Sequence, residues 1–149
     1  MSPRIYLDAC CLNRLTDDQS QARVRQEAEA VEGILRLIRE GQATWVSSAV
    51  LEVELARDPD PDRRRDVAAL FAFANEVVVP RPSERDRAAV FASLGFGAFD
   101  ALHLACAEYG GVDVFLTTDD GLLRRAHRRP QVLRIRVENP LSWFQEILP

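Results

Sequence analysis

The sequence predicts an α/β protein with a central parallel sheet of about five strands. Short segments rich in β-branched and aromatic residues alternate along the chain with longer segments of helical character. Strands that alternate with helices form a parallel sheet covered on both faces, because parallel neighbours need crossover connections. The length of 149 residues and the hydrophobic content of 47% fit a single globular domain over residues 1–149.

Five segments are expected to be the strands of this sheet. They are Arg4–Ala9, Ala43–Ser47, Val77–Val79, Val114–Thr117 and Val132–Val137. The third is a continuous run of valines that Pro80 ends, and such a run predicts a buried strand.

The clearest helix is expected from about Ser20 to Glu40. Its apolar residues recur at spacings of three and four, and Gly41 ends the pattern. Start signals locate the remaining helices. They are Ser48 before a helix that runs to Arg57, Asp60 with Pro61, Ser83 with Asp86 as a capping box, Phe99–Tyr109, Asp120–His127, and Asn139 with Pro140.

The composition indicates a soluble protein of the cytoplasm. No apolar run approaches the roughly 18 residues of a membrane span, and Asp8 interrupts the apolar start that a signal peptide would need. The three cysteines lack metal-ligand spacing, so reduced thiols are expected. The net charge is −4 and every basic residue is arginine, so a polyanion would require local arginine patches or bound cations. The chain lacks a Gly-x-Gly-x-x-Gly and a Walker A motif, which weighs against nucleotide binding.

Four acidic residues are expected to meet at one edge of the sheet. Asp8 follows the first strand and Asp119 follows the fourth, and open α/β sheets bind ligands beyond the carboxyl ends of their strands. Asp100 begins the helix Phe99–Tyr109, and Glu54 lies in the helix after the second strand. Carboxylates that cluster and stay ionised need a compensating cation, and oxygen ligands favour Mg²⁺ or Mn²⁺.

Each of these acids also has an ordinary structural interpretation. Asp119 or Asp120 is expected to cap the helix that follows, and Asp100 suits the N-terminal turn of a helix because of the helix dipole. Glu52 competes with Glu54, because the two point about 200° apart on a helix and only one can face the site.

Four ordered segments resemble the motifs of PIN-domain proteins, of which VapC-type toxins are the commonest small members. They are Tyr6–Asn13, Ser48 with Glu54 six residues on, Phe99–Ala105, and Leu116–Asp120. The resemblance implies a PIN-like three-layer α/β/α domain and a metal-dependent endoribonuclease that uses Mg²⁺ or Mn²⁺. The metal-holding and catalytic residues that it implies are Asp8, Glu54, Asp100 and Asp119, with the spacing from Ser48 favouring Glu54 over Glu52.

The resemblance also implies partners. They are an RNA substrate, a small antitoxin protein whose Arg or Lys pairs with the carboxylates, and a second copy of the chain in a homodimer. The chain departs from the family pattern at Ala9, where many members carry Ser or Thr. A hydroxyl that would orient a ligand or water is missing there, and this is expected to weaken activity without abolishing it.

Two other functions stay open. One is a PIN-like module that binds RNA or protein and has weak or no catalysis. The other is a receiver-like domain in which Asp8 or an adjacent acid binds Mg²⁺ for phosphotransfer. The sequence disfavours the receiver because Pro80 and Arg81, and no Asp, follow the third strand, and because the chain has no lysine.

One histidine and three cysteines are further candidates for functional groups. His103 and Cys106 share a helix face but lack a second pair of ligands, so supporting or core positions are expected. Cys10 and Cys11 follow a strand end, but no histidine is positioned to activate a thiol.

Two polar residues and two arginine runs complete the candidates. Thr117 and Asn13 can orient ligands or water, although a structural role is the simpler interpretation. The run Arg63–Arg65 is expected to be a solvated helix face. The arginines from position 124 to position 129 follow the Asp119 motif, so some are expected to border the site.

Overall fold

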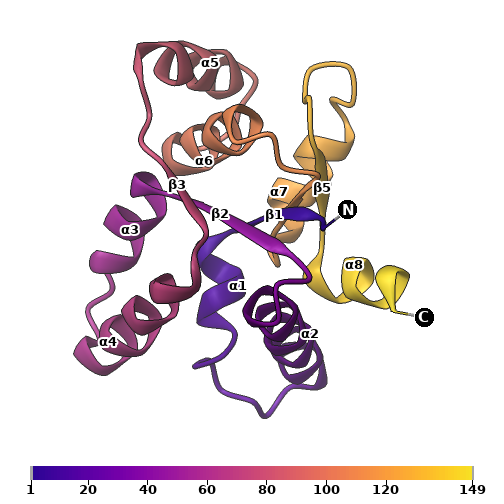
Figure 1. Ribbon diagram of the computed structural model, residues 1–149. Coiled ribbons are helices and arrows are strands. Elements are labelled where there is room, and N and C mark those ends of the chain that lie inside the picture. The colour runs from indigo at the N-terminus through magenta and orange to yellow at the C-terminus, as the bar shows by residue number, and fades with distance from the viewer. Residues whose placement is uncertain (1, 149) are drawn as a thin grey trace.

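The computed structural model describes residues 2–148 and has the predicted three-layer architecture (Figure 1). The strands are β1 (Arg4–Leu7), β2 (Thr44–Ser48), β3 (Glu76–Val78), β4 (Val114–Leu116) and β5 (Arg136–Glu138). They form one sheet in the order β3-β2-β1-β4-β5, and every pair of neighbours is parallel. The prediction of a five-stranded parallel sheet is confirmed.

Helices connect the strands and cover the sheet on both sides. They are α1 (Ala9–Asn13), α2 (Ala22–Arg39), α3 (Ala49–Ala56), α4 (Pro61–Leu70), α5 (Pro82–Ser93), α6 (Ala98–Tyr109), α7 (Asp120–His127) and α8 (Pro140–Ile147), with the short 3₁₀ helix η1 (Phe71–Phe73) after α4. In Figure 1, α5 and α6 lie on one side of the sheet, and α2 and α8 lie on the other. Within residues 2–148 no helix is both long and apolar enough to cross a membrane.

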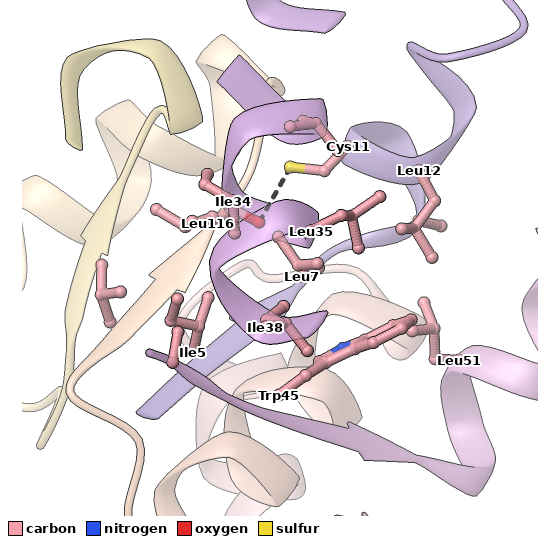
Figure 2. Packing of buried hydrophobic residues seen from close by; sticks show 14 of the residues in the cluster. Ile5, Leu7, Cys11, Leu12, Ile34, Leu35, Ile38, Trp45, Leu51 and Leu116 are labelled. Atoms are coloured by element: carbon pink, nitrogen blue, oxygen red, sulfur yellow. Dashed lines mark hydrogen bonds between the residues drawn. The ribbon is translucent and has the colours of Figure 1, made fainter. Parts of the chain in front are cut away.

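The alternation of side chains along β1 divides the core in two. Ile5 and Leu7 point to the face covered by α2 and α8, whereas Tyr6 points to the face covered by α5, α6 and α7. All three side chains are fully buried, as expected for a central strand between two helical layers. Figure 2 shows the first of these clusters, where Trp45 of β2 packs beside Ile38 of α2.

The helix starts follow the predicted caps, with one exception. Ser48, Asp60 and Asn139 each accept a hydrogen bond from a backbone N–H of the helix that they precede. The capping box predicted from Ser83 and Asp86 is wrong. The helix begins at Pro82 with Arg81 as its N-cap, two residues earlier than a Ser83 cap would place it, and Glu84 accepts the backbone N–H of Arg81.

The second and fourth predicted strands are off by one residue at one or both ends, and the other three differ further in bounds or environment. The first ends at Leu7, because Asp8 caps the short helix α1, which the sequence did not predict. The third was expected to be buried, but it is an edge strand in which Val77 is 49% exposed. The fifth is only three residues long, because residues 132–135 run as a loop before the strand begins.

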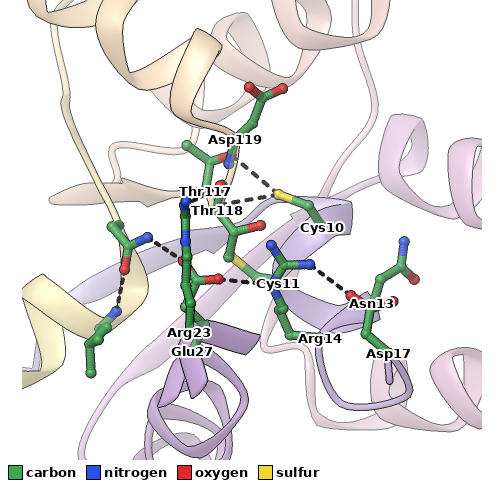
Figure 3. A network of polar contacts seen from close by, with 12 residues as sticks. Cys10, Cys11, Asn13, Arg14, Asp17, Arg23, Glu27, Thr117, Thr118 and Asp119 are labelled. Carbon is green, nitrogen blue, oxygen red and sulfur yellow. Dashed lines mark hydrogen bonds and ion pairs between the residues drawn. The ribbon is translucent and has the colours of Figure 1, made fainter. Parts of the chain in front are cut away.

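A buried carboxylate fastens α2 to two other parts of the fold (Figure 3). Glu27 is 1% exposed and accepts hydrogen bonds from Arg14 at 2.8 Å and from the side chain of Asn139 at 2.6 Å. Arg23, one turn earlier in α2, adds a contact to Glu27 at 3.3 Å and pairs with Asp120 at the start of α7. This network ties α2 to the end of α1, which follows Asp8, and to the start of α7, which follows Asp119.

Candidate metal centre

The site lies where β1 and β4 end side by side. Leu7 is in register with Leu116, so the residues that follow the two strands emerge at the same edge of the sheet. The backbone N–H of Asp8 donates to the Leu116 carbonyl at 3.0 Å, which ties the end of β1 to β4. The sequence alone predicted that the carboxyl ends of these strands would be adjacent to the ligand site.

An open cavity of about 570 Å³ occupies this edge, and all four predicted acids line it. The full lining is Asp8, Ala9, Cys10, Asn13, Glu54, Leu55, Arg57, Asp58, Pro59, Arg63, Asp100 and Asp119. The acids come from the ends of β1 and β4 and from α3 and α6, so segments far apart in the sequence meet in one hollow.

Asp8 is the most deeply placed of the four acids. It is 5% exposed, and burial raises the pKa of its carboxyl group. One carboxylate oxygen accepts the backbone N–H of Ala9 at 2.9 Å, and the other accepts the Thr117 hydroxyl at 2.9 Å. Thr117, which follows β4, therefore supplies Asp8 with a hydroxyl group, and the alanine at position 9 has none to offer.

Asp100 lies in the first turn of α6, where the helix dipole favours a negative charge. The pKa of Asp100 is nevertheless raised to about 6, first by burial and then by the charge of Asp8. Asp119 and Glu54 raise this pKa further. The elevated pKa is the expected result of carboxylates that share a partly desolvated hollow without a cation.

Asp119 has the structural role predicted for one of the two adjacent acids. One of its carboxylate oxygens accepts the backbone N–H groups of Gly121 and Leu122, which caps α7. The same residue lines the cavity, so capping and a place in the acidic hollow are compatible.

The structure distinguishes the two glutamates of α3. Glu54 lines the acidic cavity, and its Oε1 lies 3.4 Å from Nε2 of His103. Glu52 is exposed and lines a different hollow with Arg64 of α4. The helix therefore presents Glu54 to the other acids, in the orientation that the sequence analysis favoured.

His103 is brought closer to the acids than the sequence suggested. Its ring is fully buried, and Asp8, Glu54 and His103 can each offer one ligand atom within 4.8 Å of the other two. Its position three residues after Asp100 places both on one face of α6, and this spacing was the one available signal. Cys106, by contrast, packs in the core with Tyr6 and Leu104.

Cys10 also lines the cavity, in a polar setting. Its Sγ lies 3.4 Å from Oδ2 of Asp8 and 3.3 Å from Oγ1 of Thr117. Figure 3 shows this thiol beside Thr117 and Thr118. Within residues 2–148 its hydrogen-bond contacts are Asp8, Thr117 and the backbone N–H of Thr118.

The arginines at the cavity differ from those predicted. Arg63 was expected on a solvated face, but it lines the cavity and pairs with Asp17 at 2.5 Å and with Asp58 at 3.4 Å. Arg57 also lines the cavity, with its guanidinium over the ring of Phe99 at 5.1 Å. In the described part of the chain, the arginines of positions 124–129 do not contribute to this lining.

The donor atoms fit a divalent cation. Carboxylate oxygens of Asp8 and Glu54 lie close together beside the buried imidazole of His103, and Asp100 and Asp119 add charge around the same hollow. Nε2 of His103 is buried and has no hydrogen-bond partner among residues 2–148. A divalent cation bound here would offset the negative charge of the hollow.

The fold and this acidic hollow are those of a nuclease-like α/β domain, and comparison with known families identifies it. The model of the PIN domain matches residues 5–128, so the chain belongs to the PIN-domain family. Members of this family are typically nucleases that use divalent metals. Among curated proteins, none matches this chain.

Solved structures with similar folds include VapC and VapBC proteins. VapBC2 from Rickettsia felis, bound to a DNA fragment from its promoter, has a TM-score of 0.60 at 10% identity, over 91% of this chain and 98% of the other. VapBC-1 from nontypeable Haemophilus influenzae has a TM-score of 0.57 at 14% identity, over 92% and 98%. VapC20 from Mycobacterium tuberculosis, described as a sarcin–ricin loop cleaving toxin, has a TM-score of 0.56 at 16% identity, over 80% and 93%. These similarities establish a shared fold.

Proposed function

We propose that the protein is a metal-dependent endoribonuclease that cleaves RNA phosphodiester bonds in the acidic cavity. The observation that carries this proposal is the meeting of Asp8, Glu54, Asp100 and Asp119 from four separate segments in one hollow. Membership of a family of nucleases supports it, as does the absence of a competing nucleotide-binding motif from the sequence.

In this proposal the four acids hold Mg²⁺ or Mn²⁺. A bound divalent ion supplies Lewis acidity, which lowers the pKa of water and neutralises negative charge on a phosphate. Asp8 contributes a carboxylate that Thr117 and the Ala9 N–H already hold in place. The charge of the cluster also explains why such an acidic protein would need the cation before it could approach a polyanion.

Arg57 is the residue best suited to contact the RNA backbone. Its side chain lines the cavity, rests on Phe99, and forms no ion pair within residues 2–148, whereas Arg63 is occupied by Asp17 and Asp58. A guanidinium with free donors binds phosphate oxygens in a bidentate manner. We therefore assign Arg57 to the phosphate and Arg63 to the wall of the cavity.

Cleavage of unstructured and structured RNA is expected in Mg²⁺ or Mn²⁺ and is expected to stop in EDTA. Gel assays of purified protein with each metal test this directly. The same metals are expected to raise the melting temperature, because a ligand at 100 times its Kd stabilises the folded state by about 2.7 kcal/mol. For a domain of this size, that corresponds to about 5–10 °C.

The outcomes separate the possible functions. Full cleavage in EDTA would contradict a metal mechanism. A metal-dependent rise in melting temperature without cleavage of any RNA would instead favour the catalytically inactive binding module.

We further propose that the protein acts as the toxin of a toxin–antitoxin pair, as a homodimer with a small antitoxin. Support comes from the similar folds of two VapBC complexes and from the acidic cavity, which suits an Arg or Lys side chain of a partner.

Light scattering at tens of micromolar is expected to give the mass of a dimer. A co-expressed product of the adjacent upstream gene is expected to inhibit cleavage. A monomer, together with a neighbouring gene product that does not inhibit, would contradict both parts.

A further inference from the structure

His103 is buried beside the acids, and its ring is held on two sides. The ring is 0% exposed, stacks on Phe99 with centroids 6.4 Å apart, and meets Tyr6 edge-on at 5.6 Å. Its Nδ1 lies 2.6 Å from the Tyr6 hydroxyl, whereas its Nε2 has no hydrogen-bond partner among residues 2–148. A buried polar atom without a partner is costly, so the surroundings of Nε2 require an explanation.

A chain of hydroxyl groups leads to the other nitrogen of this ring. Ser48 Oγ accepts the backbone N–H of Leu51 at 3.1 Å, which caps α3, and also lies 2.6 Å from the Tyr6 hydroxyl. The Tyr6 hydroxyl in turn lies 2.6 Å from Nδ1 of His103. Each hydroxyl has a single proton, so the direction of the chain determines which nitrogen of the ring is protonated.

One direction gives both hydroxyl protons an acceptor. If Ser48 donates to Tyr6 and Tyr6 donates to Nδ1 of His103, Nδ1 is an acceptor and the neutral ring carries its proton on Nε2. In the opposite direction, the Ser48 proton has no acceptor within residues 2–148, and the Nε2 lone pair faces carboxylates. The first direction is therefore the stable one.

Nε2 lies beside Glu54. It is 3.4 Å from Glu54 Oε1 without the alignment of a hydrogen bond, and a shift of the Glu54 side chain, which is 26% exposed, would bring its carboxylate into hydrogen-bond geometry with an Nε2–H. Ser48 caps α3 with its hydroxyl and is linked through Tyr6 to the His103 ring, which lies beside a carboxylate of the same helix.

We propose that His103 is a positioning residue that holds the Glu54 carboxylate for metal binding through an Nε2–H donor fixed by the Ser48–Tyr6 chain. The inference rests on the proposed metal role of Glu54. Groups that orient metal ligands in this way change metal affinity by about 10- to 100-fold when they are removed. In this arrangement His103 acts through Glu54 and does not itself contact the metal.

A double-mutant cycle with Mn²⁺ titrated calorimetrically into the full chain tests this arrangement. His103→Leu is expected to weaken Mn²⁺ binding by about 10- to 100-fold. In a Glu54→Gln background the same change is expected to have little further effect, because the group that His103 orients is already lost. His103→Gln, which keeps a side-chain N–H donor, is expected to recover part of the affinity.

A second variant controls for the packing that is lost when the buried His103 ring is replaced. Tyr6→Phe leaves His103 in place but removes the donor to Nδ1, and it is expected to weaken Mn²⁺ binding only when Glu54 is present. Losses that multiply in the double variants would overturn the proposal. So would nitrogen hyperfine coupling in the electron spin echo signal of bound Mn²⁺, since it would make His103 a direct ligand.

The result also separates this inference from the proposed function. A wild-type protein that binds no Mn²⁺ overturns both. A wild-type protein that binds Mn²⁺, with His103→Leu and Tyr6→Phe binding it equally well, overturns only the role of His103.

Discussion

Asp8→Asn and Asp100→Asn are each expected to reduce metal-dependent RNA cleavage by at least about 100-fold. Loss of a group that only orients a metal ligand costs about 10- to 100-fold, and loss of a ligand is expected to cost more. Asparagine keeps the shape of the side chain but removes the negative charge and one carboxylate oxygen. The amide oxygen of asparagine can still accept the Ala9 N–H and cap α1, and the Thr117 hydroxyl can turn to accept from the amide N–H, so asparagine fits at position 8. The measurement is kcat/KM on one RNA substrate at saturating Mg²⁺.

The same substitutions are expected to leave the metal-free fold intact, and Asp100→Asn should stabilise it. The pKa of Asp100 is raised to about 6, well above the ordinary value of an aspartate carboxyl group. A raised carboxyl pKa means that ionisation destabilises the folded state, and this cost develops as pH rises from about 4 to 6 and is complete above that. At pH 7.5 in EDTA, the melting temperature of Asp100→Asn should therefore exceed that of the wild type.

The control for this pair is Asp62→Asn, which changes an acid in the exposed first turn of α4. It is expected to leave cleavage unchanged. An Asp100→Asn protein with wild-type activity would remove Asp100 from the metal site, and one that melts earlier than the wild type in EDTA would show that this carboxylate is not held in a repulsive cluster.

The sheet could be predicted because its signal is local. Alternating strands and helices, and caps such as Ser48 and Asp60, depend on residues a few positions apart. The errors concern features that depend on the sheet as a whole. The valines at 77 to 79 appear buried in sequence, but β3 lies at an edge because β2 is its one neighbour.

The acids could be predicted for the same reason, since a strand end fixes where Asp8 and Asp119 emerge. The arginines and His103 depend on how helices pack. Arg63 reaches the cavity because α4 contacts α1, and its partner Asp17 lies 46 positions away. The second arginine run follows Asp119 in sequence, but α7 leads it away from the cavity. Apart from the three-residue spacing between Asp100 and His103, the spacing of residues in the sequence does not contain such information.

The choice between the two glutamates of α3 gives the second large effect. Glu54→Gln is expected to lower cleavage by orders of magnitude, because Glu54 faces Asp8 and His103 in the cavity and glutamine removes its charge. Glu52→Gln is expected to stay within a few-fold of the wild type, since its side chain is exposed on another surface. The two substitutions are chemically identical, lie two positions apart on one helix and differ only in the face that they change, so each is the other's control. Both proteins should be assayed side by side on one RNA in Mg²⁺ and in Mn²⁺, with melting curves to verify folding. A larger loss for Glu52→Gln than for Glu54→Gln would mean that α3 presents its other face to the RNA, and it would remove Glu54 from the metal site.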